Sequence, residues 1–143
     1  MINTEPFAYR QISDDFGGLN FFPYLPLTLN YGNNSIETSG LLDTGASVNV
    51  MPYQIGLQLG AIWEQQNTSV QLAGNLANLP AYGLLITATV AKFSPVRLAF
   101  AWTRAENVPL ILGQVNFFLE FDVCFFRSQK TFEIHPKIDE NRR

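Results

Sequence analysis

The sequence contains one acidic residue, Asp43, in an unusual setting. Two leucines precede it and a Thr-Gly pair follows it, within the segment 41–47. Burial disfavours an ionised carboxylate, so a carboxylate at the end of an apolar strand generally has a partner or a task. Gly45 lets the backbone turn sharply and approach a neighbour closely, and the small Ala46 and Ser47 keep the corner open. The pattern indicates a carboxylate that a tight turn presents in a cleft.

One chemistry open to a carboxylate in a cleft is hydrolysis, and hydrolysis of peptide bonds by carboxylates would need two of them on one water molecule. One is ionised and takes a proton from the water, while the other is protonated and supports the carbonyl oxygen. Two carboxylates about 3 Å apart share one proton and titrate as a pair. The other aspartates are not followed by Thr-Gly or Ser-Gly; they are Asp14, Asp15, Asp122 and Asp139. A hydrolase of this kind must therefore take its second carboxylate from Asp43 of another copy, across a two-fold axis.

A β-hairpin is expected to deliver Asp43. The leucines at 25, 27 and 29 alternate with other residues, which is the period of a half-buried strand. The segment Gly32-Asn33-Asn34 is a strong turn signal. Residues 36–38 begin the return strand, which ends at Asp43.

The remaining elements are predicted to be short and mostly extended. We expect extended segments at 48–51, 70–72, 84–90, 96–102 and 108–112, short helices at 53–59 and 114–119, and a last hairpin with arms at 122–126 and 131–134. Residues 74–80 are expected to form a mobile loop or hairpin tip. The predicted class is all-β, a closed or nearly closed barrel with one or two short helices. We divide the chain into an N-terminal arm at 1–22, which is loose or contacts a partner subunit, a domain at 23–136 and a polar tail at 137–143.

Composition narrows the class of protein. The chain has 143 residues, enough for one domain with a core of its own. It is 47% hydrophobic and only 15% charged, which suggests apolar area hidden in a subunit interface or, alternatively, loose packing and a tendency to aggregate. The net charge is −3 with no basic run, so no nucleic-acid partner is expected.

The single cysteine, Cys124, rules out an internal disulfide and the zinc-binding patterns, so neither a metal nor another cofactor is expected. We predict that Cys124 is a small core residue and that the neighbouring phenylalanines, up to Phe126, pack in the core, with an interface as the alternative. The N-terminus lacks the features of a signal peptide, and no apolar run reaches about 18 residues. The expectation is a cytoplasmic protein without a membrane segment.

The order of the motifs resembles that of the retropepsin-like aspartic proteases, the single-domain relatives of pepsin. Asp43-Thr44-Gly45-Ala46 is similar to the catalytic motif of the family, and Leu110-Ile111-Leu112-Gly113 is similar to its second signature. The resemblance extends over residues 24–136. It implies a pepsin-like barrel with one lobe per chain and a homodimeric aspartic endopeptidase that acts on peptides or proteins.

The same resemblance implies roles for individual residues. Asp43, Thr44 and Gly45 would be catalytic, with the Thr44 hydroxyl bonding across the dimer axis. The substrate would contact Ala46, Ser47, Val48, Gly74, Asn75 and Ile111. Gly74 and Asn75 would lie at the tip of a flap that closes over the peptide, and residues 131–134 would match strands that join two subunits.

The sequence also departs from the family pattern. Retroviral members usually carry an arginine after the second-signature glycine and an acidic residue after the catalytic motif. Here these positions are Gln114 and Ser47 or Val48, so the expected ion pair is missing. Either neutral hydrogen bonds hold the catalytic loop, or the dimer is weaker.

Three alternatives stay open at the level of sequence. Asp43 can be an aspartate that caps its own turn. The chain can have the retropepsin fold and bind peptides or dimerise without hydrolysis, because fold does not fix function. It can also be an unrelated small β-barrel in which the tripeptide occurs by chance.

Overall fold

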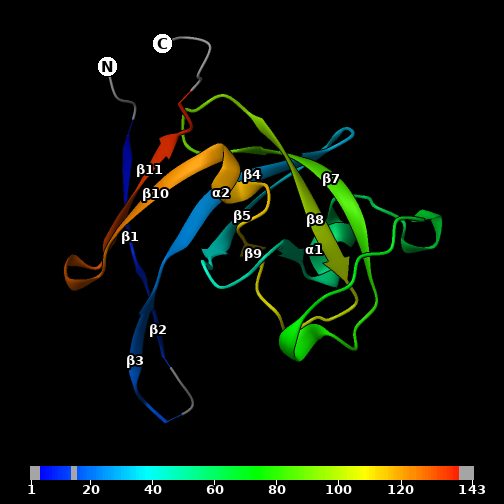
Figure 1. Cartoon of the computed structure of the whole chain (residues 1–143), viewed down its shortest axis with the longest axis horizontal. Coiled ribbons are helices and arrows are strands. Elements are labelled where there is room, and N and C mark those ends of the chain that lie inside the picture. The colour runs from blue at the N-terminus through cyan, green and yellow to red at the C-terminus, as the bar shows by residue number, and fades with distance from the viewer. Residues whose placement is uncertain (1–3, 14–15, 139–143) are drawn as a thin grey trace.

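A closed six-stranded barrel forms the centre of the computed structural model, which describes residues 4–13 and 16–138 (Figure 1). Its strands follow the order β4–β5–β9–β6–β8–β7, and β7 pairs back onto β4 to close it. The strands are β4 (Tyr24–Tyr31), β5 (Asn34–Leu42), β6 (Asn49–Met51), β7 (Ala81–Thr89), β8 (Val96–Thr103) and β9 (Ile111–Leu112). The predicted all-β class is confirmed.

The β4–β5 hairpin forms where the alternation of leucines predicted it. Leu25, Leu27 and Leu29 are all buried, while the residues between them are more exposed. Gly32 adopts a positive φ of 57° in the turn, a conformation that glycine adopts at little cost. The antiparallel register pairs Tyr24 with Leu41, so β5 ends beside the start of β4.

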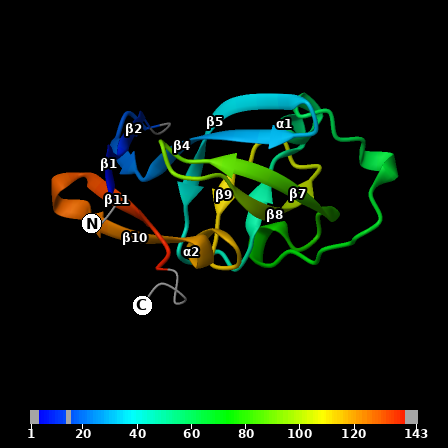
Figure 2. The same ribbon diagram turned by 90° about the horizontal axis from the view of Figure 1, so that it is seen from above.

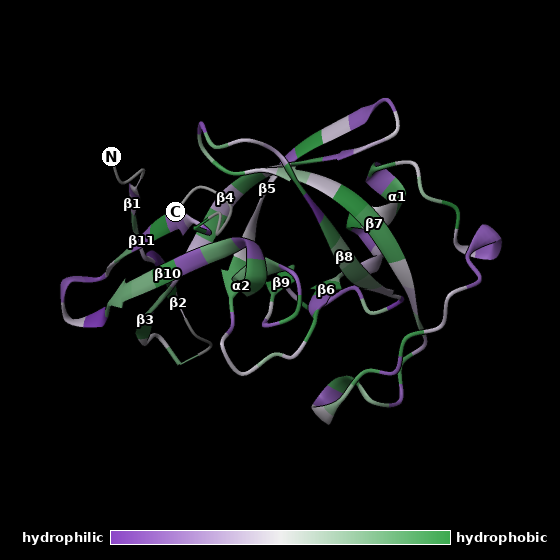
Figure 3. Ribbon diagram, turned by 45° about the horizontal axis from the view of Figure 1, so that its top comes forward, coloured by the Kyte–Doolittle hydropathy of each residue, from purple (hydrophilic) through white to green (hydrophobic). Residues whose placement is uncertain are grey.

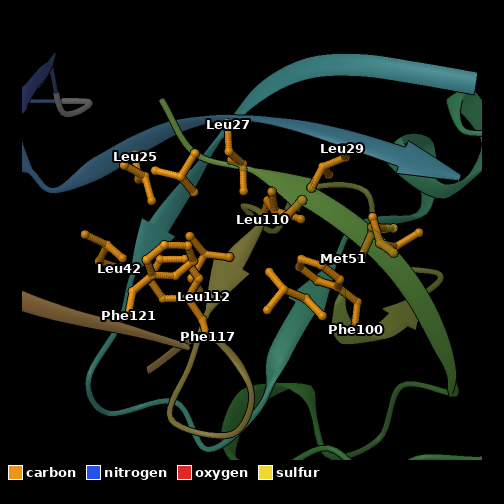
Figure 4. Packing of buried hydrophobic residues seen from close by; sticks show 14 of the residues in the cluster. Leu25, Leu27, Leu29, Leu42, Met51, Phe100, Leu110, Leu112, Phe117 and Phe121 are labelled. Atoms are coloured by element: carbon orange, nitrogen blue, oxygen red, sulfur yellow. The ribbon is translucent and has the colours of Figure 1, made fainter. Parts of the chain in front are cut away.

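Side chains from both halves of the chain fill the barrel (Figure 4). The leucines of β4 face the second signature segment and α2 (Phe117–Glu120), and the labelled residues include Leu110, Leu112, Phe117 and Phe121. Figure 3 shows hydrophobic residues along β7, β8 and α2 and hydrophilic ones at the turn between β10 and β11. The second signature segment is therefore part of the core that supports β5.

A second, three-stranded sheet joins the two ends of the chain. It has the order β1–β11–β10, built from β1 (Glu5–Ala8), β10 (Phe121–Phe126) and β11 (Thr131–Pro136). The last hairpin is confirmed. Residues 131–134 lie in β11, and both backbone edges of this strand are paired within the chain; that these residues help to join two subunits stays a prediction. β1 and β10 are the edge strands of this sheet, so each has one edge that pairs with no other strand of the described chain.

The predicted N-terminal arm, 1–22, has regular structure in its described part. After β1, the strands β2 (Arg10–Ser13) and β3 (Leu19–Phe22) form a two-stranded sheet that projects from the barrel (Figure 1). Arg10 ties its base to the barrel through Ser39, with 2.7 Å between Nη2 and Oγ. Residues 1–3, 14–15 and the tail at 139–143 lie outside the described residues.

The predicted helix at 114–119 is shorter and begins later. α2 spans Phe117–Glu120, because the backbone of Asn116, with φ 75° and ψ −68°, is not helical and separates residues 114 and 115 from the helix. These angles are those of a γ-turn, a rare and strained conformation. The helix predicted at 53–59 is confirmed as α1 (Tyr53–Gln58).

Two further expectations fail in the second half of the chain. Residues 70–72 are not a strand; they follow a single bridge between Ser69 and Tyr82. Cys124 is exposed, not buried, and the exposed fractions of Phe125 and Phe126 are 37% and 39%. These residues lie on β10, which covers the barrel only at its beginning, and the apolar composition of the strand did not reveal that its far end leaves the core.

Among the described residues, none of the helices is long and apolar enough to cross a membrane.

Candidate active site

Asp43 lies directly after β5, at the point where β9 is inserted between β5 and β6. β5 and β9 run parallel and pair Leu42 with Leu112. The pairing continues one step, because the Asp43 N–H donates to the Leu112 carbonyl at 3.0 Å. The backbone of Asp43 is therefore fixed by the barrel, and its side chain is half-buried.

The Thr44–Gly45 turn wraps around the carboxylate. The Gly45 N–H donates to Asp43 Oδ1 at 3.0 Å, and the Ala46 N–H donates to the Asp43 carbonyl at 3.1 Å. A Cβ on Gly45 would lie 3.3 Å from Oδ1, which is a tight contact. An aspartate that caps its own turn makes the same bond, so this bond alone does not separate a structural from a catalytic role for Asp43.

The second signature segment and the two residues after it hold the loop at residues 44–48 from behind. The Gln114 N–H donates to the Ala46 carbonyl at 2.9 Å, and the Val115 N–H donates to the Ser47 carbonyl at 2.8 Å. A Cβ on Gly113 would lie 2.6 Å from the Val48 carbonyl oxygen. Glycine is needed at 113 because the two backbones approach too closely for any side chain.

A buried asparagine joins three strands behind the loop. Asn49 is fully buried; its Oδ1 accepts from the Gly113 N–H at 2.7 Å and its Nδ2 donates to the Ala99 carbonyl at 3.1 Å. A buried amide with both ends bonded is a rigid cross-link, since leaving either group unpaired is costly. Asn49 was not among the residues predicted from the sequence; its signal was a polar side chain within the apolar run Val48–Met51.

Neutral hydrogen bonds replace the ion pair that the sequence lacks. The Gln114 side chain donates from Nε2 to the Thr44 carbonyl oxygen at 2.9 Å. The side chains of Gln114 and Asn49 are both uncharged, and together they connect the second signature segment to the loop at residues 44–48 and the strand that follows it. Of the two explanations for the missing ion pair, the structure therefore supports the neutral one.

A cavity of about 290 Å³ opens beside Asp43. It brings together every sequence-predicted site residue except Thr44, which is exposed and does not line it. The predicted lining residues are Asp43, Gly45, Ala46, Ser47, Val48, Gly74, Asn75 and Ile111, and the lining that prediction missed is Val50, Leu72, Ala73 and Leu76. The walls beyond the carboxylate are largely apolar, which suits an apolar side chain of a ligand.

Residues 74–80 form a loop with one 3₁₀ turn, Gly74–Leu76, which is one of the two forms expected for this segment. That the loop closes over a ligand as a flap stays a prediction. Two hydrogen bonds close its base, from the Val70 N–H to the Ala81 carbonyl at 3.0 Å and from the Gly83 N–H to the Thr68 carbonyl at 2.8 Å.

The loop is also anchored from inside. The Gln71 side chain donates to the Ala77 carbonyl at 2.9 Å, across the loop. Leu72 is 4% exposed and belongs to a small apolar cluster with Val50 and Ala101. Leu72, at the start of the loop, therefore packs against Val50, which also lines the cavity, whereas Gly74 and Asn75 are exposed.

A larger cavity, of about 480 Å³, lies elsewhere on the molecule. Its lining includes Lys92, Phe93 and the ion pair between Lys137 and Glu120, with 3.1 Å between Nζ and Oε2. The carboxylate there is paired, and Asp43 is not part of the lining. We therefore place the candidate active site at the smaller cavity. Within 4–13 and 16–138, no group of three or more His, Cys, Asp and Glu side chains is arranged to hold a metal ion.

An Asp-Thr-Gly turn follows a strand of the barrel, and the segment that contains Gly113 passes behind this turn. This architecture is a retropepsin-like all-β fold with one lobe per chain. Among solved structures, the chain is similar to the crystal structure of a retropepsin-like aspartic protease from Rickettsia conorii. The TM-score is 0.59, the alignment covers 95% of this chain and 96% of that chain, and the sequence identity is 13%. At this identity the likeness shows the fold alone. No protein-family model and no curated protein sequence matches the chain.

Proposed function

We propose that this chain is an aspartic endopeptidase that acts as a homodimer, with Asp43 of each copy in one shared active site. The observation that carries the proposal is the position of Asp43. It lies at the cavity, held by the Gly45 N–H at 3.0 Å and supported from behind by Gly113 and Asn49. A turn-capping aspartate needs neither the cavity nor this support.

The second copy follows from the chemistry. Asp43 is the one carboxylate that lines the cavity in the described structure, whereas water-mediated peptide hydrolysis by carboxylates needs two. The ionised Asp43 takes a proton from the water, whose oxygen bonds to the peptide carbonyl carbon. The protonated Asp43 donates to the carbonyl oxygen. The C–N bond then breaks as the first carboxyl passes the proton it took from water to the amide nitrogen, and one hydroxyl of the tetrahedral carbon returns a proton to the second carboxylate, which leaves a carboxyl and an amine product.

The surface around the catalytic loop supports a partner at this place. Val115, whose N–H bonds to Ser47, is 47% exposed, and Leu119 on α2 is 65% exposed. α2 leads directly into β10, which lies on the same side of the barrel (Figure 2) and carries the exposed Phe125 and Phe126. An open, apolar strand edge without proline or lysine is a surface that generally pairs or becomes covered.

The second candidate is a peptide-binding or dimerisation module that does not hydrolyse its ligand. It shares the fold, the cavity and the dimer with the enzyme, so only chemistry at Asp43 separates the two. The observation that favours this candidate is the absence of the ion pair, since neutral hydrogen bonds hold the loop in its place.

The test compares the wild-type protein with Asp43→Asn on a mixed peptide pool at acidic pH. The exchange keeps the shape of the side chain and removes its proton chemistry, so we expect cleavage to be lost with the fold intact. Glu64→Gln is the matched control, because Glu64 is an exposed carboxylate on the 3₁₀ turn Trp63–Gln65, outside the cavity. Cleavage by Asp43→Asn at the wild-type rate would exclude this site as the catalyst.

Mixing the two proteins tests the shared site. If subunits exchange freely, an equimolar mixture forms half heterodimers, each with a single Asp43. The activity should then fall with the square of the wild-type fraction, and sedimentation at micromolar concentration should show dimers. Activity proportional to the wild-type fraction would instead indicate that one chain is sufficient.

A further inference from the structure

One peptide unit connects Gln114 to the carboxylate of Asp43. The carbonyl oxygen of Thr44 accepts a hydrogen bond from Gln114 Nε2 at 2.9 Å. The N–H of the same peptide unit belongs to Gly45 and donates to Asp43 Oδ1 at 3.0 Å. The two bonds therefore lie at opposite ends of a single planar group.

We propose that Gln114 is a positioning residue for Asp43 and acts through the Thr44–Gly45 peptide unit. The proposal rests on the proposed function for its effect on catalysis. A peptide unit is planar and trans, so its C=O and N–H point in opposite directions. A donor that fixes the direction of the Thr44 carbonyl therefore also fixes the direction of the Gly45 N–H.

The Gln114 side chain also strengthens the bond that it directs. A donor on a carbonyl oxygen polarises the amide, so the N–H at the other end becomes a better donor. The Gly45 N–H then holds Asp43 Oδ1 in one orientation toward the cavity. Because the Gln114 amide is neutral, it does this without adding a charge beside a pair of carboxylates that must share one proton.

The backbone of Gln114 is fixed independently of its side chain. Its N–H donates to Ala46 at 2.9 Å, and Gly113 before it is bonded to Asn49. The side chain is exposed at the surface. A substitution at 114 should therefore remove the bond to Thr44 without creating a cavity or disturbing the barrel.

Two substitutions separate a positioning role from a merely structural one. Gln114→Ala removes the donor at every pH. Gln114→Glu keeps the shape, but an ionised carboxylate only accepts hydrogen bonds and cannot donate to the Thr44 carbonyl. A protonated glutamic acid has one donor, so the bond can form again at a pH below about 4, the usual range for glutamate protonation.

The kinetic test measures kcat and KM for both variants between about pH 3 and pH 7. A net hydrogen-bond contribution of ordinary size corresponds to a roughly 3- to 10-fold lower kcat for Gln114→Ala, with KM little changed. Gln114→Glu should approach the wild-type kcat at the acid end and fall to or below the value of Gln114→Ala above about pH 5, where the glutamate cannot donate and also adds a charge. Gln66→Ala is the matched control, because Gln66 also donates from Nε2 to a backbone carbonyl at 2.9 Å, that of Ile62, away from the site.

A second readout does not depend on activity. The amide proton of Gly45 in NMR spectra should lie upfield of its wild-type position in Gln114→Ala at each pH, should approach that position only at acid pH in Gln114→Glu, and should not differ from wild type in Gln66→Ala. A Gly45 signal unchanged by Gln114→Ala overturns the proposal even if the protein cleaves peptides, and so does an unchanged kcat. If the Gly45 signal shifts as expected but the protein cleaves no peptide, the result would instead contradict the proposed function.

Discussion

The replacement Gly113→Ala tests how closely the backbone at Gly113 approaches the backbone of the loop at residues 44–48. The added Cβ would lie 2.6 Å from the Val48 carbonyl oxygen, 2.8 Å from the Val48 carbonyl carbon and 2.9 Å from the Ala46 carbonyl oxygen. All three neighbours are backbone atoms, so no side chain can rotate away. The two segments must separate by roughly 0.8 Å before the shortest contact reaches the ordinary distance of 3.4 Å.

That separation lengthens the hydrogen bonds on either side of the crossing. They are the 2.7 Å bond from Gly113 to Asn49 and the 2.9 Å bond from Gln114 to Ala46. Overpacking of a buried site typically costs about 1–3 kcal/mol, and we expect about 2 kcal/mol here. For a domain of this size, that cost lowers the melting temperature by roughly 4–8 °C.

Gly83→Ala on β7 is the matched control. Its Cβ would meet side chains of Thr68 and Val70 no closer than 3.6 Å, which is ordinary contact. This variant should be unchanged or stabilised by about 0.4–1 kcal/mol, through the lower entropy of the unfolded chain. Urea unfolding followed by tryptophan fluorescence, at one protein concentration, compares the variants. If Gly113→Ala is as stable as Gly83→Ala, the close crossing is not present in solution.

Two further predictions concern pH. Cleavage should be fastest at acid to mildly acid pH, because one carboxylate of the pair must hold a proton; a rate that still rises above pH 8 argues against a shared proton. Burial raises the pKa of Tyr9 above its usual value of 10.0, against the opposing effect of Arg127. Since the folded state keeps this proton longer, stability is complete below pH 10 and declines as the pH rises further. Urea unfolding between pH 9 and pH 11.5 should show a smaller decline for Tyr9→Phe, and equal declines would show that Tyr9 is not the cause.

Local patterns were sufficient for much of the fold. The alternating leucines and the turn at 32–34 predicted the β4–β5 hairpin, and the structure confirms it. The helix at 53–59 and the last hairpin were also predicted from short segments. These elements form from neighbouring residues, whose periodicity and turn chemistry are written in one stretch of sequence.

Expectations failed where distant segments compete for the same groups. Residues 114 and 115 bond to carbonyls about 70 residues earlier, and the non-helical backbone of Asn116 then delays the start of α2 to Phe117. The sequence also did not predict that β1, from the other end of the chain, pairs with β11. No local pattern reveals such long-range pairing, because the composition of a strand does not indicate which other strand will pair with it.

The sequence by itself determined that one Asp-Thr-Gly turn ends an apolar strand and that a second carboxylate must come from another copy if the chain hydrolyses peptides. It also identified most of the residues that line the cavity. Only the tertiary structure decided what holds the turn: a buried asparagine, an exposed glutamine and a glycine against which the backbone of the loop packs. The physical reason is that residue types and spacing specify a turn locally, whereas the donors and acceptors that orient it come from segments that only folding brings together.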